Sequence, residues 1–299
     1  MKRRKFLRKA GMYSGAIALG SAIFIPRVAQ AAGPLKKAVK LGMVDEDVSL
    51  AEKFQMLKEL GFDGVEMNSP NDYETQEVID AQKMAGIPIH GVVDSVHWNK
   101  TLGDPDPAVR EEGLEGLRTA ITDAKDYGAT SVLLVPAVVN ENISYDDAYK
   151  RSQTEIKKVI PLAEKQNIQI LIENVWNKFL LSPLEEAQYL DELDSKWIGA
   201  YFDVGNVVNF GYPEQWIRIL GHRVKKLDIK EYSREKRDKE GPFAGFRVPI
   251  GEGSVDWAAV RKALNDINYS GWATAEVSGG NRERLQDIAT RMNRVLQMT

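Results

Sequence analysis

The sequence contains no cysteine and only three histidines among its 299 residues. The first absence excludes disulfides, thiolate metal sites and a lipid-modified cysteine after an export signal. Any metal ion must therefore be held by oxygen atoms or by imidazole nitrogen. Because histidine is also scarce, carboxylates become the principal candidate ligands.

Acidic residues outnumber basic residues outside the first 31 residues. That segment holds seven basic residues and no acidic one, namely Lys2, Arg3, Arg4, Lys5, Arg8, Lys9 and Arg27. The rest of the chain has 33 basic against 43 acidic residues, a formal net charge of −10. An acidic body argues against nucleic acid or an anionic membrane surface as a partner.

The N-terminal segment predicts an export signal. Its basic start, Arg3-Arg4-Lys5-Phe6-Leu7-Arg8-Lys9, resembles a twin-arginine signal, and Ala29-Gln30-Ala31 has the form of a cleavage site. The apolar stretch from Ala10 to Ile25 is too short and too weakly apolar for a convincing membrane span. We expect residues 1–31 to be a signal peptide and residues 32–299 a periplasmic domain without stable membrane insertion. An uncleaved anchor is the alternative.

Short β-rich runs alternate with longer helical patterns along the remaining chain. The expected strands are Val39–Met43, Gly64–Met67, Ile87–Val93, Ser131–Val135, Ile168–Glu173, Ile198–Asp203, Val224–Lys230 and Trp272–Val277. The expected helices are Leu50–Leu60, Thr75–Ala85, Ala108–Tyr127, Tyr145–Lys165, Leu184–Leu193, Glu214–Leu220, Val255–Ile267 and Arg282–Gln297. Strict alternation of this kind predicts a single-domain α/β fold, the (β/α)₈ TIM barrel.

Two further features bear on the fold. A doubly wound open sheet usually carries a glycine-rich phosphate loop after its first strand, but here we expect that strand to end in Met43-Val44-Asp45-Glu46. The charged segment from Tyr232 to Pro249 is either a solvated excursion or a lid over the barrel mouth.

Four acidic residues fall at the carboxyl ends of expected strands five to eight: Glu173, Asp203, Asp228 and Glu276. Buried carboxylates are costly unless something pairs them, and four that converge would repel one another. A divalent cation removes this repulsion, because hard cations prefer oxygen ligands. The alternative is that each carboxylate makes an ordinary salt bridge at a strand end.

A metal between two glutamates suits proton transfer at a carbon next to a carbonyl group. One glutamate would remove the proton, and the other would return it on the opposite face or to the neighbouring carbon. We expect Glu173 and Glu276 to be this catalytic pair.

The chain resembles the sugar phosphate isomerase/epimerase family, the xylose-isomerase-like barrel group that includes ketose 3-epimerases and endonuclease IV. The resemblance is carried by Ile172-Glu173-Asn174-Val175-Trp176-Asn177, Tyr201-Phe202-Asp203-Val204-Gly205-Asn206, Gly251-Glu252-Gly253-Ser254-Val255-Asp256-Trp257 and Gly271-Trp272-Ala273-Thr274-Ala275-Glu276. It implies a metal held from strands five to eight, with the outer two glutamates as acid and base. It also implies that His90, Asn206, Lys230 and Arg234 lie near the substrate.

The sequence departs from the family pattern at two positions. The family usually has histidine where this chain has Asp228, and often histidine where it has Asn206. Aspartate keeps a ligand but adds negative charge, so we expect Mn²⁺ or Mg²⁺. The same change is compatible with weak metal binding or altered chemistry.

Further polar and aromatic residues near the strand ends are candidates for substrate binding. They are Glu66, His90, Trp98, Asn174 and Trp176. The two tryptophans could stack on the apolar face of a sugar or simply cap the barrel. His90 could equally be a hydrogen-bonded core histidine.

These features predict a metal-dependent sugar isomerase or 3-epimerase that acts on a keto-sugar through an enediolate. Export favours a free sugar or glycoside over a sugar phosphate. The alternatives are a lyase or hydrolase that removes a proton at C2 of a 3-keto-glycoside, and a non-catalytic sugar-binding barrel. An endonuclease would need more histidines and a basic face. The sequence leaves open whether the chain forms a homo-oligomer.

Overall fold

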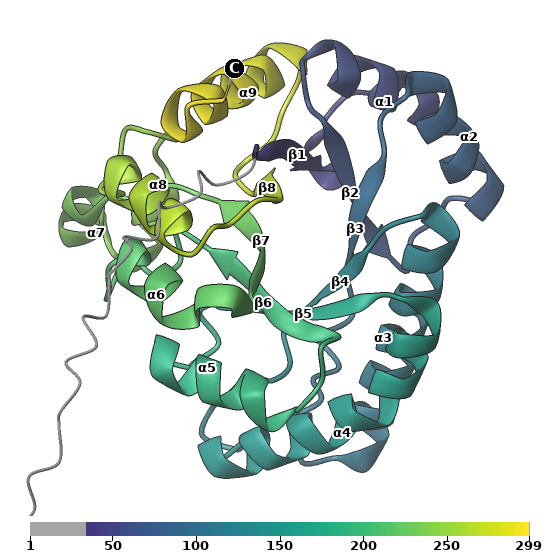
Figure 1. Cartoon of the computed structure of the whole chain (residues 1–299), viewed down its shortest axis with the longest axis vertical. Coiled ribbons are helices and arrows are strands. Elements are labelled where there is room, and N and C mark those ends of the chain that lie inside the picture. Colours follow the sequence, from purple (N-terminus) through teal and green to yellow (C-terminus); the bar gives the residue numbers. More distant parts are fainter. Residues whose placement is uncertain (1–33, 299) are drawn as a thin grey trace, which may run out of the picture.

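A computed structural model describes residues 34–298, and the expected signal segment 1–31 lies outside the described residues. Eight parallel strands close into a barrel in sequence order (Figure 1). They are β1 Lys36–Lys40, β2 Gly64–Ser69, β3 Ile89–Asp94, β4 Ser131–Leu134, β5 Gln169–Glu173, β6 Ile198–Asp203, β7 Val224–Ile229 and β8 Trp272–Ala275. The predicted TIM barrel is therefore confirmed.

Helices surround the strand ring on its outside (Figure 1). The α-helices are α1 Leu50–Glu59, α2 Thr75–Ala85, α3 Pro107–Tyr127, α4 Tyr145–Gln166, α5 Pro183–Glu192, α6 Pro213–Leu220, α7 Arg234–Glu240, α8 Trp257–Asp266 and α9 Arg282–Leu296. Three short 3₁₀ helices are η1 Leu41–Met43, η2 Gly221–Arg223 and η3 Pro242–Phe246. Within the described range, every helix is too short or too polar to cross a membrane.

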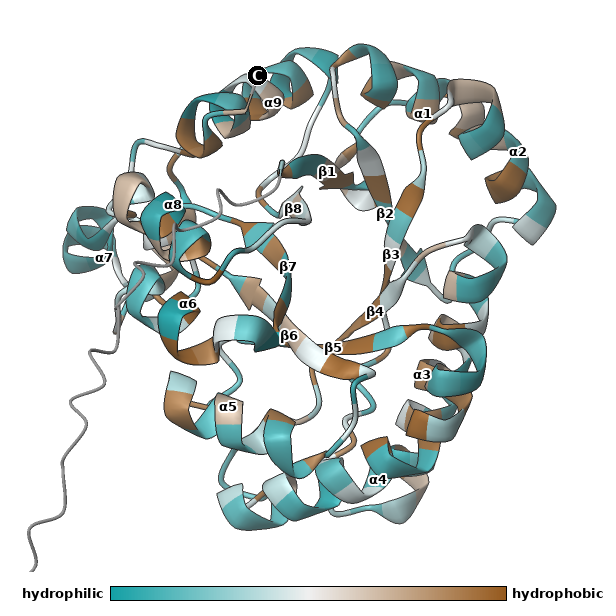
Figure 2. Ribbon diagram, in the orientation of Figure 1, coloured by the Kyte–Doolittle hydropathy of each residue, from teal (hydrophilic) through white to brown (hydrophobic). Residues whose placement is uncertain are grey.

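The apolar pattern explains the layering. In β5, Ile170, Leu171 and Ile172 are all buried, because a barrel strand has one face against the helices and one inside the ring. Figure 2 shows the same division, with apolar residues along the strands and polar residues on the outer sides of the helices. Helix ends follow local signals: Ser49 forms a capping box with Glu52 before α1, and Gly86 ends α2 in the left-handed conformation at φ 62°.

The first strand ends earlier than predicted, and this places Lys40 at the mouth of the barrel. The pairing of β1 with β8 ends at Val39 and Ala275, and the chain turns into η1 directly after Lys40. The expected end at Met43 is therefore wrong. Leu41 and Met43 are apolar and buried, so in the sequence they look like a continuation of the strand. In the structure they belong to the 3₁₀ turn η1. Lys40, not Met43, ends β1.

The charged segment after β7 is folded. It contains α7 and η3, and the Tyr232 hydroxyl donates a hydrogen bond to the Pro242 carbonyl at 2.9 Å. Phe243 and Phe246 of η3 contact Trp176, with ring centroids 5.3 and 4.9 Å apart. The segment therefore covers part of the barrel mouth and is not a purely solvated excursion.

Candidate active site

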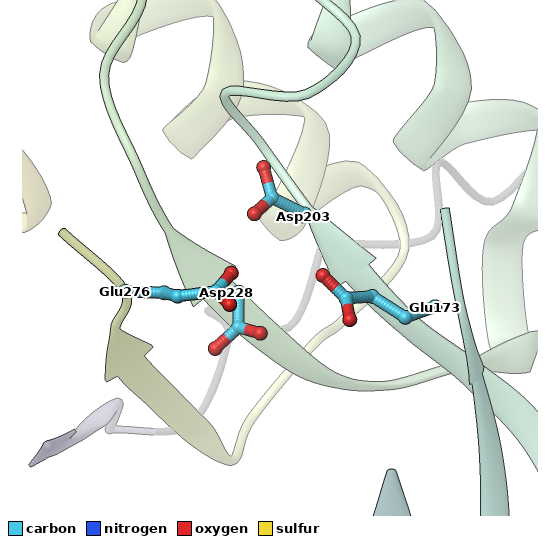
Figure 3. Close-up of side chains that lie close together, drawn as sticks. All are labelled: Glu173, Asp203, Asp228 and Glu276. Atoms are coloured by element: carbon cyan, nitrogen blue, oxygen red, sulfur yellow. The ribbon is translucent and has the colours of Figure 1, made fainter. Parts of the chain in front are cut away.

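The four predicted carboxylates converge at the carboxyl end of the barrel. One oxygen from each of Glu173, Asp203, Asp228 and Glu276 lies within 4.8 Å of the others, and Figure 3 shows the carboxylates turned toward a common centre. Asp203 and Asp228 are fully buried, Glu173 is nearly so, and the Glu276 side chain is 31% exposed. The structure thus gathers the acidic residues that the strand ends predicted.

Strand register explains this convergence. Glu173 and Asp203 are the last residues of β5 and β6, and Asp203 pairs with Asp228 across β6 and β7. Glu276 directly follows β8, and its backbone N–H donates to the Ile229 carbonyl at 3.1 Å. Parallel strands of similar length bring their carboxyl ends to one rim of a barrel.

Each of the four carboxylates keeps one oxygen without a hydrogen bond from the described residues. These oxygens are Glu173 Oε1, Asp203 Oδ2, Asp228 Oδ1 and Glu276 Oε2. Asp203 Oδ2 and Glu276 Oε2 are nevertheless ion-paired with Lys230, whereas Glu173 Oε1 and Asp228 Oδ1 have neither a hydrogen bond nor an ion pair among the described residues. Buried acceptors normally have a partner, so these two oxygens beside the cluster indicate a place for a further cationic group. The residues therefore fit a divalent ion, for which carboxylate oxygens are suitable ligands.

Two lysines also reach this cluster. Lys40 Nζ lies 2.9 Å from Asp228 Oδ2 and 3.1 Å from Glu276 Oε1. Lys230 Nζ lies 2.8 Å from Glu276 Oε2 and 3.1 Å from Asp203 Oδ2. If all four carboxylates are ionised, the two ammonium groups balance two of them, and two negative charges remain for a divalent ion.

Burial and neighbouring charges split the pKa values of the two glutamates. Burial and the charge of Glu276 raise the pKa of Glu173 well above its ordinary value. Burial alone would also raise the pKa of Glu276, but Lys230 and Lys40 outweigh it and hold that pKa well below its usual range. Without an ion, these shifts favour the protonated form of Glu173 and the ionised form of Glu276. Such a split is typical of an acid and base pair.

Asp228 behaves like Glu173. Burial raises its pKa well above the ordinary value, and Glu276 and Glu173 add to the effect, although Lys40 opposes it. The pKa of Asp203 rises only to about 6, because Lys230 and the Asn206 backbone N–H offset part of its burial. In the ion-free site, burial therefore favours the protonated forms of Glu173 and Asp228.

A chain of hydrogen bonds runs through the barrel interior to Glu66. Lys226 Nζ donates to His90 Nδ1 at 3.1 Å, so the other ring nitrogen carries the proton and donates to Thr274 Oγ1 at 3.1 Å. Thr274 then donates to the Tyr201 hydroxyl at 2.8 Å, and Tyr201 donates to Glu66 Oε1 at 2.9 Å. Burial, with the charge of Lys226, lowers the pKa of His90 well below 6.5 and keeps it neutral.

The placement of His90 differs from the prediction. It is the second residue of β3, not a strand end, and its ring stacks on Trp272 with centroids 4.5 Å apart. The next residue, Gly91, has no room for a side chain, since a Cβ there would lie 2.7 Å from Glu66 Oε1 and 3.0 Å from Lys226 Nζ. Both Glu66 and His90 therefore belong to the interior network and not to the cavity wall. Glu66 Oε2 nevertheless lies 3.8 Å from Lys40 Nζ, which links the network to the carboxylates.

A cavity of about 590 Å³ opens above the carboxylates. Six residues expected in the site line it: Trp98, Glu173, Trp176, Asn206, Lys230 and Glu276. Asn174 lies beside it and fixes Asp203, because its side chain donates to the Asp203 carbonyl at 2.9 Å and accepts from the Asp203 N–H at 2.8 Å.

Arg234 is directed elsewhere. Its guanidinium donates to the carbonyls of Val208 and Gly211 and lies over the ring of Tyr212, 5.0 Å from the centroid. It is not among the residues that line the cavity. The position of Arg234 therefore does not support the expected contact with substrate, because its N–H groups are hydrogen-bonded to the loop before α6.

Lys40, Phe243 and Phe246 line the cavity but were not predicted to do so. Lys40 was missed because the expected strand continued past it. The two phenylalanines lie in the charged segment, where the only signal was two aromatic residues, Phe243 and Phe246, amid polar sequence.

Comparison with known proteins places this site in context. The model of the xylose isomerase-like TIM barrel family matches residues 54–296. The L-ribulose-5-phosphate 3-epimerase UlaE of Escherichia coli (strain SMS-3-5 / SECEC) is 26% identical over 254 residues, covering 79% of this chain and 86% of that protein.

Solved structures share the fold at lower identity. The 3-keto-D-glucoside 4-epimerase YcjR from E. coli aligns with a TM-score of 0.71 and 17% identity, covering 88% of this chain and 99% of that chain. The IOLI protein with a bound zinc atom aligns with a TM-score of 0.75 and 16% identity, covering 88% and 98% of the two chains. These likenesses extend over nearly the whole described barrel.

Proposed function

The chain belongs to the xylose isomerase-like TIM barrel family, and we propose that it is a metal-dependent sugar isomerase or epimerase that acts on a keto-sugar. The observation that carries this proposal is the convergence of four carboxylates beneath a sugar-sized cavity, with Glu173 Oε1 and Asp228 Oδ1 lacking any partner among the described residues. Glu173, Asp203, Asp228 and Glu276 would hold the ion, most suitably Mn²⁺ or Mg²⁺. When bound, such an ion supplies positive charge beside an oxygen on which negative charge develops.

The protein residues would move the proton. Glu276, held ionised by Lys40 and Lys230, would take a proton from the carbon next to the substrate carbonyl, leaving an enediolate. Glu173, whose raised pKa favours its protonated form, would deliver a proton to the opposite face of that carbon and give an epimer. Delivery to the neighbouring carbon, with the hydroxyl proton passing from one enediolate oxygen to the other, would give an isomer. In both cases the two glutamates exchange protonation states.

Lys40 and Asp228 together would take the place of the family histidine. The carboxylate adds one negative charge at that position, and the ammonium 2.9 Å away adds one positive charge. The pair is therefore formally neutral, as an imidazole ligand is. Asp228 Oδ1 stays available to an ion, because Lys40 contacts only the other oxygen.

The cavity favours an unphosphorylated substrate. Its lining contains two cationic side chains, Lys40 and Lys230, and both are already paired with carboxylates. No arginine is among the lining residues, although arginine is the usual bidentate partner of a phosphate. A free sugar or a glycoside suits this wall better. Delivery to the periplasm by the expected N-terminal signal is consistent with that choice.

A second candidate function is elimination from a 3-keto-glycoside, and a second cavity beside the first favours it. Glu276 would remove the proton at C2, the C1–C2 double bond would form, and the C1–O bond would break. The leaving oxygen would take its proton from Glu173. The products would be an unsaturated keto-sugar and a free alcohol.

Proton NMR in D₂O with Mg²⁺ would test these proposals. Ketohexoses and 3-keto-glycosides should exchange a proton next to the carbonyl, with a new epimer in the first case or an unsaturated sugar in the second. The Glu252→Gln variant is a suitable control, since Glu252 pairs with Arg291 and does not belong to the carboxylate cluster. If the protein bound these sugars without any exchange of their protons with solvent, the remaining interpretation would be a non-catalytic sugar-binding barrel.

A further inference from the structure

A second cavity of about 310 Å³ adjoins the first. The two cavities share four wall residues, namely Val175, Trp176, Asn206 and Phe243. The second cavity is otherwise lined mainly by apolar side chains from the loops after β5 and β6 and from α6: Phe179, Leu180, Leu181, Phe210 and Trp216. Its polar walls are asparagine amides and Lys178, without a carboxylate. Its chemistry therefore differs from that of the acidic site beside it.

The loop after β5 is held in an unfavourable backbone conformation at this cavity. Lys178 and Leu180 have φ values of 59° and 52°, in the left-handed region that a bulky residue such as leucine rarely adopts. Asn177 fixes the loop, because its side chain donates to the Ala137 carbonyl at 2.8 Å and accepts from the Phe179 N–H at 3.1 Å. Such strain persists only where surrounding contacts enforce it, and it often occurs at binding sites.

Aromatic rings stand at the entrance of the second cavity and are incompletely buried. Phe210 is 56% exposed and Phe243 is 70% exposed. Trp176 lines both cavities, and its Nε1 donates a hydrogen bond to the Asn206 carbonyl at 2.8 Å. Exposed aromatic surface beside a fixed indole favours a ligand that covers it with an apolar or aromatic face.

We propose that the second cavity is a subsite for an apolar, preferably aromatic, aglycone, so that the substrate is a glycoside and not a free ketose. This inference rests on the proposed function, which puts the sugar ring in the first cavity above Glu173 and Glu276. A substituent on the anomeric oxygen then extends across the shared wall at Trp176 and Asn206. A free ketose would leave the aromatic walls uncovered. A charged aglycone would find no opposite charge except Lys178.

Binding of two simple glycosides tests the subsite without any turnover. Isothermal titration calorimetry of the full folded protein with Mg²⁺ would compare phenyl β-D-glucopyranoside with methyl β-D-glucopyranoside. We expect the phenyl glycoside to bind at least about tenfold more tightly, in line with the transfer of a phenyl group from water to an apolar wall. Phe210→Ala should reduce that preference at least about threefold and leave the affinity for the methyl glycoside unchanged.

Leu184→Ala is the matched control. Leu184 is 70% exposed on α5 and lines neither cavity, so this change should preserve the preference. Equal affinities for the two glycosides, or no measurable binding of either, would overturn the subsite. It would also be overturned if Phe210→Ala converted a dimer to a monomer in sedimentation analysis while leaving the preference intact, because the patch would then join two copies of the chain. A phenyl preference without proton exchange in D₂O would support the subsite and contradict only the proposed reaction.

Discussion

The Lys40 ammonium lies 2.9 Å from the Asp228 carboxylate, at the end of the first strand and near the end of the seventh. The sequence separation is large, but β1 and β7 both border β8 in the closed ring. The contact gives the extra negative charge of Asp228 a fixed partner. It explains how aspartate can stand where the related proteins are expected to have histidine.

A double-mutant cycle on this pair should reveal strong coupling. Lys40→Met leaves a buried carboxylate without its counter-charge, and Asp228→His leaves the ammonium with one partner fewer. At a pH above the raised pKa of Asp228, where the pair is ionised, each single change should lower the free energy of unfolding of the ion-free protein by roughly 2–4 kcal/mol, because breaking a buried pair leaves an uncompensated charge. The double variant should lose at least about 1 kcal/mol less than the sum, measured by urea denaturation.

The exposed pair Lys150 and Asp146 on α4 provides the control. Its side chains are 73% and 72% exposed, so Lys150→Met and Asp146→His should combine with a coupling below about 0.5 kcal/mol. Additive losses at Lys40 and Asp228 would refute the idea that the pair acts as one neutral group.

Replacing either glutamate of the catalytic pair by glutamine should abolish epimer formation while keeping the shape of the site. Glu276→Gln removes the base, so exchange of the substrate proton in D₂O should fall by about 100-fold or more. Glu173→Gln removes the acid, so formation of the new epimer should fall by about 100-fold or more while Glu276 still exchanges the substrate proton. If Glu276→Gln retained the exchange rate of the Glu252→Gln control, Glu276 could not be the base.

Metal binding should release protons at neutral pH. Burial raises the pKa of Asp228 and favours its protonated form in the ion-free site, and an ionised carboxylate binds a cation far better than the protonated acid does. Glu173 would keep its proton as the acid and present only a neutral oxygen to the ion. We expect about one proton per Mn²⁺ at pH 7, with affinity rising as pH increases through the pKa of Asp228. Calorimetry in buffers of different ionisation enthalpy measures this number. Release of about two protons would mean that Glu173 is also ionised with the ion bound, which contradicts its role as the acid.

Glu186 should make the protein less stable as pH rises. It is fully buried in α5, neither of its carboxylate oxygens has a hydrogen-bond partner among the described residues, and burial raises its pKa from 4.5 to about 8. Between these values the unfolded chain loses the proton and the folded chain keeps it, so stability falls with pH until about 8. Glu186→Gln should remove this dependence and add a few kcal/mol at pH 8 but almost nothing at pH 4.

Urea denaturation at the two pH values measures the effect. The control is Glu164→Gln, on the exposed side of α4, which should change the free energy of unfolding only slightly, and by the same amount, at pH 4 and pH 8. An unchanged pH dependence in Glu186→Gln would show that the carboxyl group is already ionised in the folded protein.

The order of elements and the acidic residues at the ends of β5 to β8 could be predicted from the sequence. Both depend on local patterns: apolar runs of strand length, helix stops such as Gly86, and a charged residue directly after each run. Because parallel strands share one direction, residues at their carboxyl ends must gather at one rim, so Glu173 and Asp203 could be grouped without coordinates. The same rule failed for His90, because its strand begins later than the apolar run indicates.

The sequence by itself thus determined the barrel and the four carboxylates, since periodicity and strand direction are properties of successive residues. Only the tertiary structure decided what balances those carboxylates. Lys40 and Lys230 reach the cluster because the strands close into a barrel and because their side chains are long. An ammonium group on a flexible side chain can occupy many positions, and sequence spacing does not determine which one. The second cavity likewise exists only because loops after β5 and β6 meet η3, and contacts between segments so far apart are set by packing.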